Sequence, residues 1–313
     1  MRLNLLGPTQ LVDDSGSAVE VGPVKRRVVL AVLGLEAGRV VPVGRLAELL
    51  WAGDPPASAR TVMQGHVSAL RRLLGPGLRL VTREPGYLLA ADRGAVDVQR
   101  FRDLIETAAV SEDDQAIRLL STALALWRGP ALADLTGHGL VTSLTASLEE
   151  SRLDALAALA GRLLRTGSGS HGVPALRAAV EAAPLHEPLV AALVLCLYQA
   201  GRQADALAAY QSARERLAEQ LGVDPSQELR AAYLTVLHNS PVSASNARRA
   251  APARPPASRP PPPESGGSLQ RELASIPLNE HERSAFDHGQ AALSHLLSRL
   301  SHGQADHHQA DLQ

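Results

Sequence analysis

The 313-residue sequence has one cysteine, no long apolar run and few aromatic residues. A single cysteine excludes an internal disulfide and any metal site built from several cysteines, and it fits a reducing compartment. Because Cys196 lies in the apolar run Leu193–Leu197, we expect a buried core residue, with a reactive thiol as the alternative. No apolar stretch approaches the roughly 20 residues of a membrane span, and the N-terminus has no signal-peptide pattern. These absences predict a cytoplasmic protein without a membrane partner.

The sequence also lacks the motifs of the common enzyme classes. No Gly-x4-Gly-Lys-Ser/Thr phosphate-binding loop occurs, although one lysine, Lys25, is present. His281, His288, His295 and His302 recur every seven residues, which leaves neighbours ~10 Å apart on a helix, too far to share a metal ion. No combination of a nucleophile and a base stands out either. We therefore expect no enzyme activity, no metal and no cofactor.

Composition and charge favour a helical protein with a basic N-terminal part. Aromatic residues make up only 3% of the chain, so its cores must consist of Leu, Val and Ala, two of which head the helix scale. Residues 1–93 carry twelve Arg or Lys and eight Asp or Glu (+4), whereas residues 94–241 carry twelve and seventeen (−5). Five arginines and no acidic residue lie between Asp54 and Glu84. Such a stretch suits a polyanionic partner, and a solvated surface that arose by chance is the alternative.

The local patterns of residues 1–93 predict strands, three helices and a hairpin, in this order. Alternating apolar residues around a polar turn at 13–17 favour a small antiparallel sheet over residues 3–21. Residues 78–90 are predicted to form a hairpin with its turn at Pro85-Gly86. This order is typical of a winged helix-turn-helix, an α+β domain that binds DNA. Apolar residues at helical spacing place the helices at 25–36, 43–51 and 58–74, the third with Ser58 as its N-cap.

The predicted helix over 58–74 carries the residues that point to DNA. Its apolar residues Met63, Val67, Leu70 and Leu74 share one face and are expected to pack inward. Gln can pair with adenine and Arg with guanine in the major groove, while Ser and Thr bind bases or phosphates. A merely solvated polar face is the alternative, but the order of the elements around this helix favours DNA binding. The polar face consists of Arg60, Thr61, Gln64, Ser68, Arg71 and Arg72.

The predicted hairpin would form the wing of this domain. Arg83 lies beside the Pro85-Gly86 turn, where a contact to the minor groove or to a phosphate is expected. Tyr87 lies on the other side of the same turn. We therefore add Arg83 and Tyr87 to the predicted DNA-binding residues.

From Asp97 onward the sequence predicts only helices. Gly201, Ala206, Tyr210 and Ala213 have the small and aromatic spacing of a tetratricopeptide hairpin, in which Tyr210 would fill the gap between hairpins. We expect a mainly α protein, with an all-α, tetratricopeptide-like helical-repeat domain over 94–241 behind the winged helix of 1–93; a plain helical bundle is the alternative. The candidate helices lie at 97–109, 112–128, 145–165, 172–183, 187–200, 203–221 and 225–238.

Three further segments are predicted at the C-terminal end. Residues 242–278 are rich in Pro, Ala and Arg and have the composition of a linker. Residues 279–301 have an amphipathic helical pattern, with Asn279 and Glu282 at capping-box spacing. Residues 302–313 are polar and are predicted to be disordered.

Two stretches of the sequence resemble a known family of regulators. Residues 2–93 resemble the OmpR-type DNA-binding domain in the run His66-Val67-Ser68-Ala69-Leu70-Arg71-Arg72-Leu73-Leu74 and in the wing from Arg83 to Leu89. Residues 97–238 resemble the bacterial transcriptional activator domain, most clearly at 97–101, 126–129 and 197–207, and again at 221–226. Together they resemble the Streptomyces antibiotic regulatory protein family, in a short form without an appended nucleotidase domain.

The resemblance implies a function and partners. It implies a transcription activator of a secondary-metabolite (antibiotic) gene cluster that binds direct repeats in double-stranded promoter DNA beside the −35 element and associates with itself there. It also implies contact with RNA polymerase, through a sigma factor or the alpha subunit, and a location at the nucleoid. In the OmpR-type family the loop between the second and third helices faces polymerase. Here that loop carries Asp54 followed by Pro55-Pro56, which would stiffen it, so Asp54 is the candidate contact.

A second hypothesis belongs to another class of protein. The chain would then be a helical-repeat adaptor that regulates transcription through protein partners, without specific DNA binding of its own. Loss of the basic face would favour this adaptor, but Arg60, Gln64, Arg71 and Arg72 are present.

Overall fold

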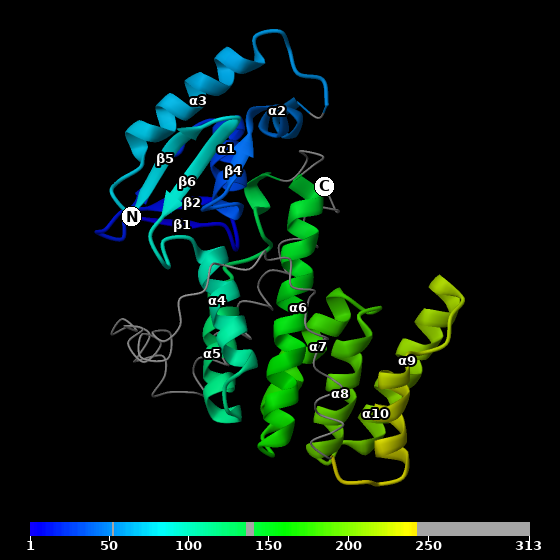
Figure 1. Cartoon of the computed structure of the whole chain (residues 1–313). Helices are drawn as coiled ribbons and strands as arrows, with labels where there is room; N and C mark the ends of the chain where they lie inside the picture. Colours follow the sequence, from blue (N-terminus) through cyan, green and yellow to red (C-terminus); the bar gives the residue numbers. More distant parts are fainter. Residues whose placement is uncertain (52, 136–140, 243–313) are drawn as a thin grey trace, which may run out of the picture.

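The computed structural model describes residues 1–51, 53–135 and 141–242. Its N-terminal region combines two small sheets with three helices, and the region that follows is built from helices alone (Figure 1). The predicted fold class, mainly α with a winged helix-turn-helix ahead of an all-α region, is confirmed. The predicted linker, C-terminal helix and tail lie outside the described residues, apart from Val242.

The first sheet is a small antiparallel sheet in the order β1-β2-β3. Its strands are β1 (Arg2–Asn4), β2 (Gln10–Val12) and β3 (Ala18–Val19). The turn between β2 and β3 is organised by Asp13, whose carboxylate accepts hydrogen bonds from the backbone N–H groups of Ser15 and Ser17. The predicted sheet and turn are confirmed, although β3 ends at Val19, two residues before the predicted end.

The second sheet contains the wing and has the order β4-β6-β5. Strands β5 (Leu78–Arg83) and β6 (Gly86–Ala91) form the predicted antiparallel hairpin. Its turn is at Glu84-Pro85 and not at the predicted Pro85-Gly86, because Gly86 is already paired with Arg83. Strand β4 (Val40–Pro42) pairs with β6 and was not predicted, because three residues are too few to show an alternating pattern. Gly86 is required here by close approach, since a Cβ at this position would lie 1.9 Å from the carbonyl oxygen of Val41.

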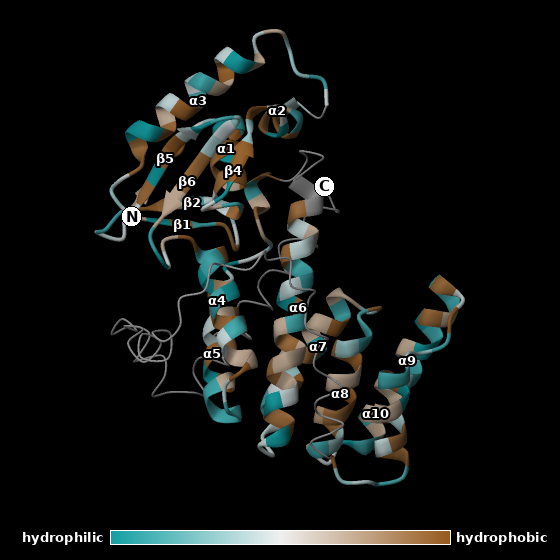
Figure 2. Cartoon of the chain, in the orientation of Figure 1, coloured by the Kyte–Doolittle hydropathy of each residue, from teal (hydrophilic) through white to brown (hydrophobic). Residues whose placement is uncertain are grey.

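Three helices complete the N-terminal region: α1 (Val24–Leu35), α2 (Val43–Trp51) and α3 (Ala59–Leu73). Every residue of α1 from Val28 onward is buried, and α1 packs against α3. Hydrophobic and hydrophilic residues lie on different sides of α3 (Figure 2), so that one side faces the core. The predicted positions of the three helices are confirmed to within two residues.

One predicted detail at the start of α3 is wrong. Ser58 precedes the helix, but its hydroxyl makes no capping hydrogen bond. Its backbone has φ −83° and ψ 1°, which is close to a turn, whereas a capping serine has an extended backbone that places its hydroxyl over the first N–H groups. The helix instead begins from a backbone turn, in which the N–H of Ala59 donates to the carbonyl of Pro56.

The helical region is organised around α8, in which every residue from Leu189 to Leu197 is buried. Cys196 belongs to this core, and burial raises the pKa of its thiol to about 12, so the predicted core role is confirmed. Tyr210 stacks on Tyr233 of the next helix, with ring centroids 4.2 Å apart; its predicted place between helical hairpins stays a prediction. The helices are α4 (Asp97–Ala109), α5 (Asp113–Ala125), α6 (Val141–Arg165), α7 (Val173–Ala182), α8 (Glu187–Gln199), α9 (Gln203–Leu221) and α10 (Gln227–Leu237). Two 3-10 turns, η1 (Ala133–Leu135) and η2 (Gly169–Gly172), lie between them.

The two regions are joined by hydrogen bonds from the segment that follows β1. The buried carboxylate of Asp97, at the start of α4, accepts the backbone N–H groups of Leu5 and Leu6 at 2.8–2.9 Å. The N–H of Arg128 donates to the carbonyl of Leu6, and the N–H of Leu132 donates to that of Leu5. The helical region thus holds the edge of the N-terminal region at Leu5 and Leu6.

Candidate nucleic-acid interface

The predicted polar residues of α3 lie together on its exposed face. Met63, Val67 and Leu70 are buried on the opposite side, and Leu74, just beyond the helix, is half-buried against the same core. This packing leaves the other side of the helix outside the fold. The exposed residues include all those predicted from the sequence: Arg60, Thr61, Gln64, Ser68, Arg71 and Arg72.

Arg71 differs from the other arginines of α3 because it binds the wing. Its Nε donates to the carbonyl of Leu80 at 2.9 Å, and its Nη2 donates to the hydroxyl of Thr82 at 2.6 Å. Within the described part of the chain, Arg60 and Arg72 form no hydrogen bond or ion pair. Arg71 therefore ties α3 to β5, while Arg60 and Arg72 project from the helix.

The wing presents one predicted residue and buries the other. Arg83 is exposed at the end of β5, beside the turn. Tyr87 is only 7% exposed and pairs with Val41 of β4, so its ring belongs to the core and we remove it from the candidate DNA-contacting residues. Alternation along β6 explains this burial, because Tyr87 and Leu89 point to the same inner face.

Sequence reasoning missed Arg79 as a member of the interface. Arg79, Val81 and Arg83 alternate with the buried Leu78 and Leu80 and are exposed on β5. Successive side chains of a strand point to opposite faces, so the predicted strand could have placed Arg79 on the same face as Arg83.

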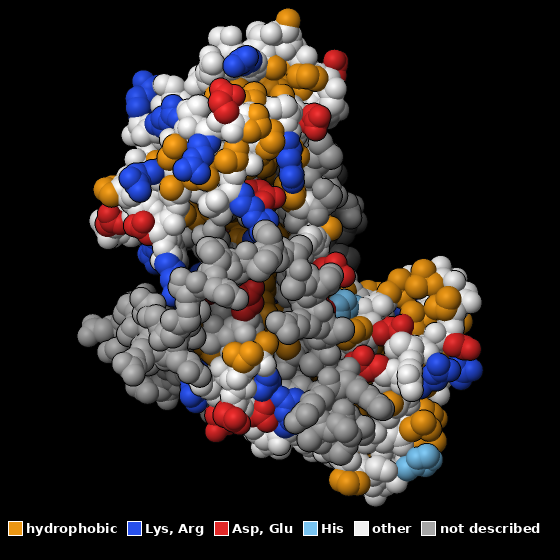
Figure 3. All heavy atoms as spheres, viewed as in Figure 1, with side chains coloured by type: hydrophobic (Ala, Val, Ile, Leu, Met, Phe, Trp, Pro, Cys, Tyr) orange, Lys and Arg blue, Asp and Glu red, His pale blue; other side chains and the backbone are white. Residues whose placement is uncertain are grey.

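The charge of this surface comes from arginine. Figure 3 shows several Lys and Arg side chains along the side of the N-terminal region where Figure 1 places α3 and β5. His66 of α3 adds no charge at neutral pH, because burial and then the nearby cations Arg26 and Lys25 lower its pKa. Lys25 itself lies over the ring of Trp51, with its Nζ 4.8 Å from the ring centroid. The exposed face of α3 is therefore cationic and has no carboxylate of its own.

The connection between α2 and α3 is exposed from Gly53 to Ser58. It leaves α2 through a backbone turn, in which the N–H of Asp54 donates to the carbonyl of Trp51 at 3.1 Å. Gly53 has φ +93°, a conformation that favours glycine. Asp54 is exposed to solvent in this turn.

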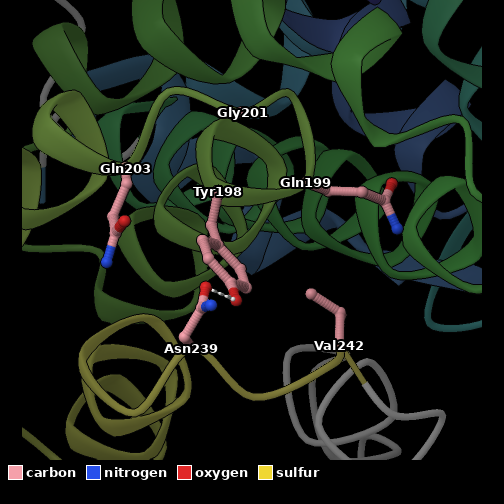
Figure 4. Close-up of a pocket in the computed structure, with 6 residues that line it drawn as sticks. All are labelled: Tyr198, Gln199, Gly201, Gln203, Asn239 and Val242. Atoms are coloured by element: carbon pink, nitrogen blue, oxygen red, sulfur yellow. Dashed lines mark hydrogen bonds between the residues drawn. The ribbon is translucent and has the colours of Figure 1, made fainter.

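A pocket of about 430 Å³ lies in the helical region, between the α8–α9 turn and the residues after α10 (Figure 4). Its polar groups are largely bonded within the chain. The hydroxyl of Tyr198 donates to Oδ1 of Asn239 at 2.8 Å, and Nε2 of Gln203 donates to the carbonyl of Val236 at 3.2 Å. Among the described residues, its lining contains no carboxylate, histidine or cysteine. The lining residues are Tyr198, Gln199, Gly201, Gln203, Asn239 and Val242.

No group of three or more His, Cys, Asp or Glu side chains in residues 1–51, 53–135 and 141–242 is arranged to hold a metal ion. Over the same residues, no helix combines the length and apolar character that a membrane span requires.

Strands, three helices and a hairpin, followed by packed helices, define a winged helix-turn-helix protein with an all-α region behind it. A family model described as the bacterial transcriptional activator domain matches residues 96–237. The chain is 35% identical to the transcriptional regulator RedD of Streptomyces coelicolor, over 77% of this chain and 72% of RedD. It is also 35% identical to the regulatory protein DnrI of Streptomyces peucetius, over 77% of this chain and 93% of DnrI.

A solved structure has the same architecture. The structure of Mycobacterium tuberculosis EmbR in complex with a low-affinity phosphopeptide superimposes with a TM-score of 0.73 and 36% identity, over 80% of this chain and 69% of that one. The chain therefore belongs to the Streptomyces antibiotic regulatory protein family of transcriptional regulators. Membership confirms the predicted class, a transcriptional regulator and not an enzyme.

Proposed function

We propose that the chain activates transcription by inserting α3 into the major groove of a specific promoter sequence. The observation that carries the proposal is the exposed face of α3, which is cationic, contains no carboxylate and faces away from the core. A helix presented in this way fits the major groove, where the edges of the bases can be distinguished. In this proposal, residues 1–93 form the DNA-binding domain and residues 94–241 form the helical domain behind it.

The side chains of the face divide into two roles. Gln64 and Arg60 lie toward the N-terminal half of α3, the part of a recognition helix that contacts base edges. Thr61 and Ser68 offer hydroxyls to bases or phosphates, and Arg72 offers a charge to the phosphate backbone. On the wing, Arg83 and Arg79 supply contacts to the adjacent minor groove or its phosphates.

The test begins with the selection of bound sequences from a random DNA pool. Affinity for the selected operator is then measured for the parent and for a variant with Arg60, Gln64, Arg71 and Arg72 changed to Ala. Loss of most specific binding is expected, because base contacts and several phosphate contacts disappear together. A matched control changes Gln211, Arg118, Arg214 and Arg216 to Ala; these residues are also exposed, carry the same total charge and lie on the helical region. Normal binding by the α3 variant would show that the assignment is wrong.

We further propose that the chain binds direct repeats beside the −35 element of antibiotic gene promoters, associates with itself there, and recruits RNA polymerase. The exposed loop that carries Asp54 supports a polymerase contact, because its prolines limit the entropy lost when it binds. Asp54→Ala should keep its DNA affinity but reduce transcription in an assay with purified polymerase. Equal transcription from variant and parent would remove Asp54 from the polymerase interface, and lost DNA binding would give the loop a structural role.

The competing function is that of an adaptor that acts through protein partners only. The selection of bound sequences distinguishes the two functions. The adaptor is supported if the selection enriches no sequence while transcription of the target genes still depends on the protein. The projecting side chains of Arg60 and Arg72 support DNA binding over the adaptor, because a solvated helix face needs no cluster of arginines free of acids.

A further inference from the structure

The C-terminal half of α10, the last helix of the described chain, has apolar residues on both of its sides. Ala232 and Val236 are buried against the helical region. On the other side Leu234 is 46% exposed and Leu237, one turn later, is 49% exposed. Figure 3 shows hydrophobic side chains at the surface of the helical region, on the side where Figure 1 places α9 and α10. We call Leu234 and Leu237 the outer face of α10.

Such an outer face is unexpected at the end of a row of packed helices. A helix that is apolar all round is normally covered on every side, and the last helix of a row needs a polar outer side to stay soluble. The exposed side of the neighbouring α9 is polar, since it carries Gln211, Arg214 and Glu215. The outer face of α10 is not, so we expect a further element to cover it.

The sequence beyond α10 contains a segment of matching character, the amphipathic pattern over 279–301. At helical spacing, its histidines His281, His288 and His295 fall toward one side. A helix of this kind would bury its apolar side and present the histidines to water, which gives the row of helices the polar outer side that α10 lacks. The large apolar residues on the other side of the pattern are Phe286, Leu293, Leu296, Leu297 and Leu300.

We propose that residues 279–301 fold back as a helix onto the outer face of α10 and form the last helix of the helical region. Residues 243–278 connect the two elements and contain Gly266-Gly267, at which the chain can reverse direction. Their length suffices, because an extended residue spans up to ~3.3 Å, whereas α10 is about 16 Å long. The inference does not depend on the proposed DNA binding.

The tether favours this segment over a second copy of the chain. Two elements joined by a flexible linker meet at an effective concentration on the order of 1 mM, which far exceeds the concentration of a second copy in dilute solution. Apolar contact supplies most of the attraction, since exposed ion pairs contribute little.

The charges beside the face are also complementary. Arg230 is exposed one turn before Leu234 and forms no ion pair among residues 1–51, 53–135 and 141–242. The first half of the segment carries the carboxylates Glu280, Glu282 and Asp287. Docking of the segment therefore brings acidic residues toward a cation without a partner.

Hydrogen exchange of the full chain, followed by mass spectrometry, tests this contact. Amides of 286–300 should exchange roughly tenfold more slowly in the parent than in a variant with both Leu234→Ser and Leu237→Ser, because an amphipathic helix depends on packing for its stability. Changing Leu293 and Leu297 to Ser should remove the same protection from the other side of the contact. Amides of α8 should exchange as in the parent in both variants, which shows that the fold is kept.

Val110→Ser is the matched control. Val110 is 88% exposed directly after α4, so it is also an exposed apolar residue but lies outside α10. This variant should leave the exchange of 286–300 unchanged. Fast exchange of these amides in the parent would overturn the proposal, and so would protection that survives the change of Leu234 and Leu237.

Two further outcomes would assign the outer face to another occupant and overturn the proposal. The first is protection confined to 268–276, a shorter apolar stretch that contains Leu269, Leu273 and Ile276. The second is protection that is lost on dilution, together with a dimer in light scattering, because only a contact between two copies depends on concentration. A contact within one chain should give the same exchange over a roughly hundredfold dilution.

Discussion

Two pairs of arginines, one pair in each region of the molecule, have opposite surroundings. In the helical region, Arg162 and Arg165 are largely buried between helices and are bonded to the Asp113 carboxylate. In the N-terminal region, Arg60 and Arg72 project from α3. A buried guanidinium must find partners inside the fold, whereas an exposed one remains available to a phosphate or a base. The comparison indicates that Arg162 and Arg165 stabilise the helical region from within, whereas Arg60 and Arg72 have no partner among the described residues.

The largest effect is expected from a substitution of Asp97, which lies where the two regions meet. Its carboxylate accepts N–H groups from Leu5 and Leu6 across the junction of the two regions. Asp97→Ala should lower the free energy of unfolding by roughly 3 kcal/mol, because two buried N–H groups lose their acceptor. Chemical denaturation at neutral pH measures this loss.

Asp97→Asn is the matched control, since its amide oxygen keeps one acceptor and its loss should be smaller. Burial raises the pKa of Asp97 despite the hydrogen bonds and Arg128, which lower it, so the neutral amide also avoids the cost of a buried charge. Equal stability of the parent and Asp97→Ala would show that the hydrogen bonds of the Asp97 carboxylate do not stabilise the fold.

A second change tests the internal use of arginine. Arg162 donates to the carbonyls of Ser111, Ala108 and Ala109 and to Asp113, and thereby caps the C-terminal end of α4 against α6. Arg162→Ala should cost roughly 2 kcal/mol of unfolding free energy, because a charge-assisted network is lost. The exposed Arg118 is the control on α5, and Arg118→Ala should stay within about 0.5 kcal/mol of the parent. Similar losses in both variants would contradict the distinction between buried and exposed arginines.

Within the N-terminal region, Gln64 and Arg72 separate base reading from phosphate binding. Gln64→Ala should cost roughly 1–3 kcal/mol on the selected operator and relax the preference at one base position. Arg72→Ala should weaken binding to all sequences alike and reduce the salt slope by about one. Titrations at several salt concentrations, on the operator and on a scrambled duplex, measure both effects. An unchanged salt slope for Arg72→Ala would remove the phosphate contact, and an unchanged base preference for Gln64→Ala would remove the base contact.

The sequence predicts those features that depend on residues close together in the chain, and it does not predict those that depend on contacts between distant segments. The helix α3 and its exposed face follow from local periodicity, so Gln64 and Arg72 could be placed from sequence. The direction of Arg71 could not, because its partners on β5 are set by how the hairpin packs on the helix. Tyr87 was misplaced for a related reason: strand alternation has two phases, and only the pairing of β6 with β4 shows which one is buried. Local patterns thus predict elements, while the roles of residues at their contacts require the tertiary structure.

The smallest expected effect is on the pH dependence of Tm, and it differs between an aspartate of the helical region and one of the N-terminal region. The Arg165 side chain, and then that of Arg162, lower the pKa of Asp113 against the opposing effect of partial burial. A carboxylate with a lowered pKa in the folded state stabilises the protein above its unfolded pKa of about 4, and this contribution is lost as pH falls through the folded value. Asp113→Asn should therefore lower Tm by roughly 1–4 °C at pH 7, with the difference shrinking below about pH 4. The exposed Asp54 forms no ion pair among the described residues, so Asp54→Asn should leave Tm unchanged at both pH values. A difference for Asp113→Asn that stayed constant from pH 7 to pH 3 would mean that the carboxylate charge does not stabilise the helical region.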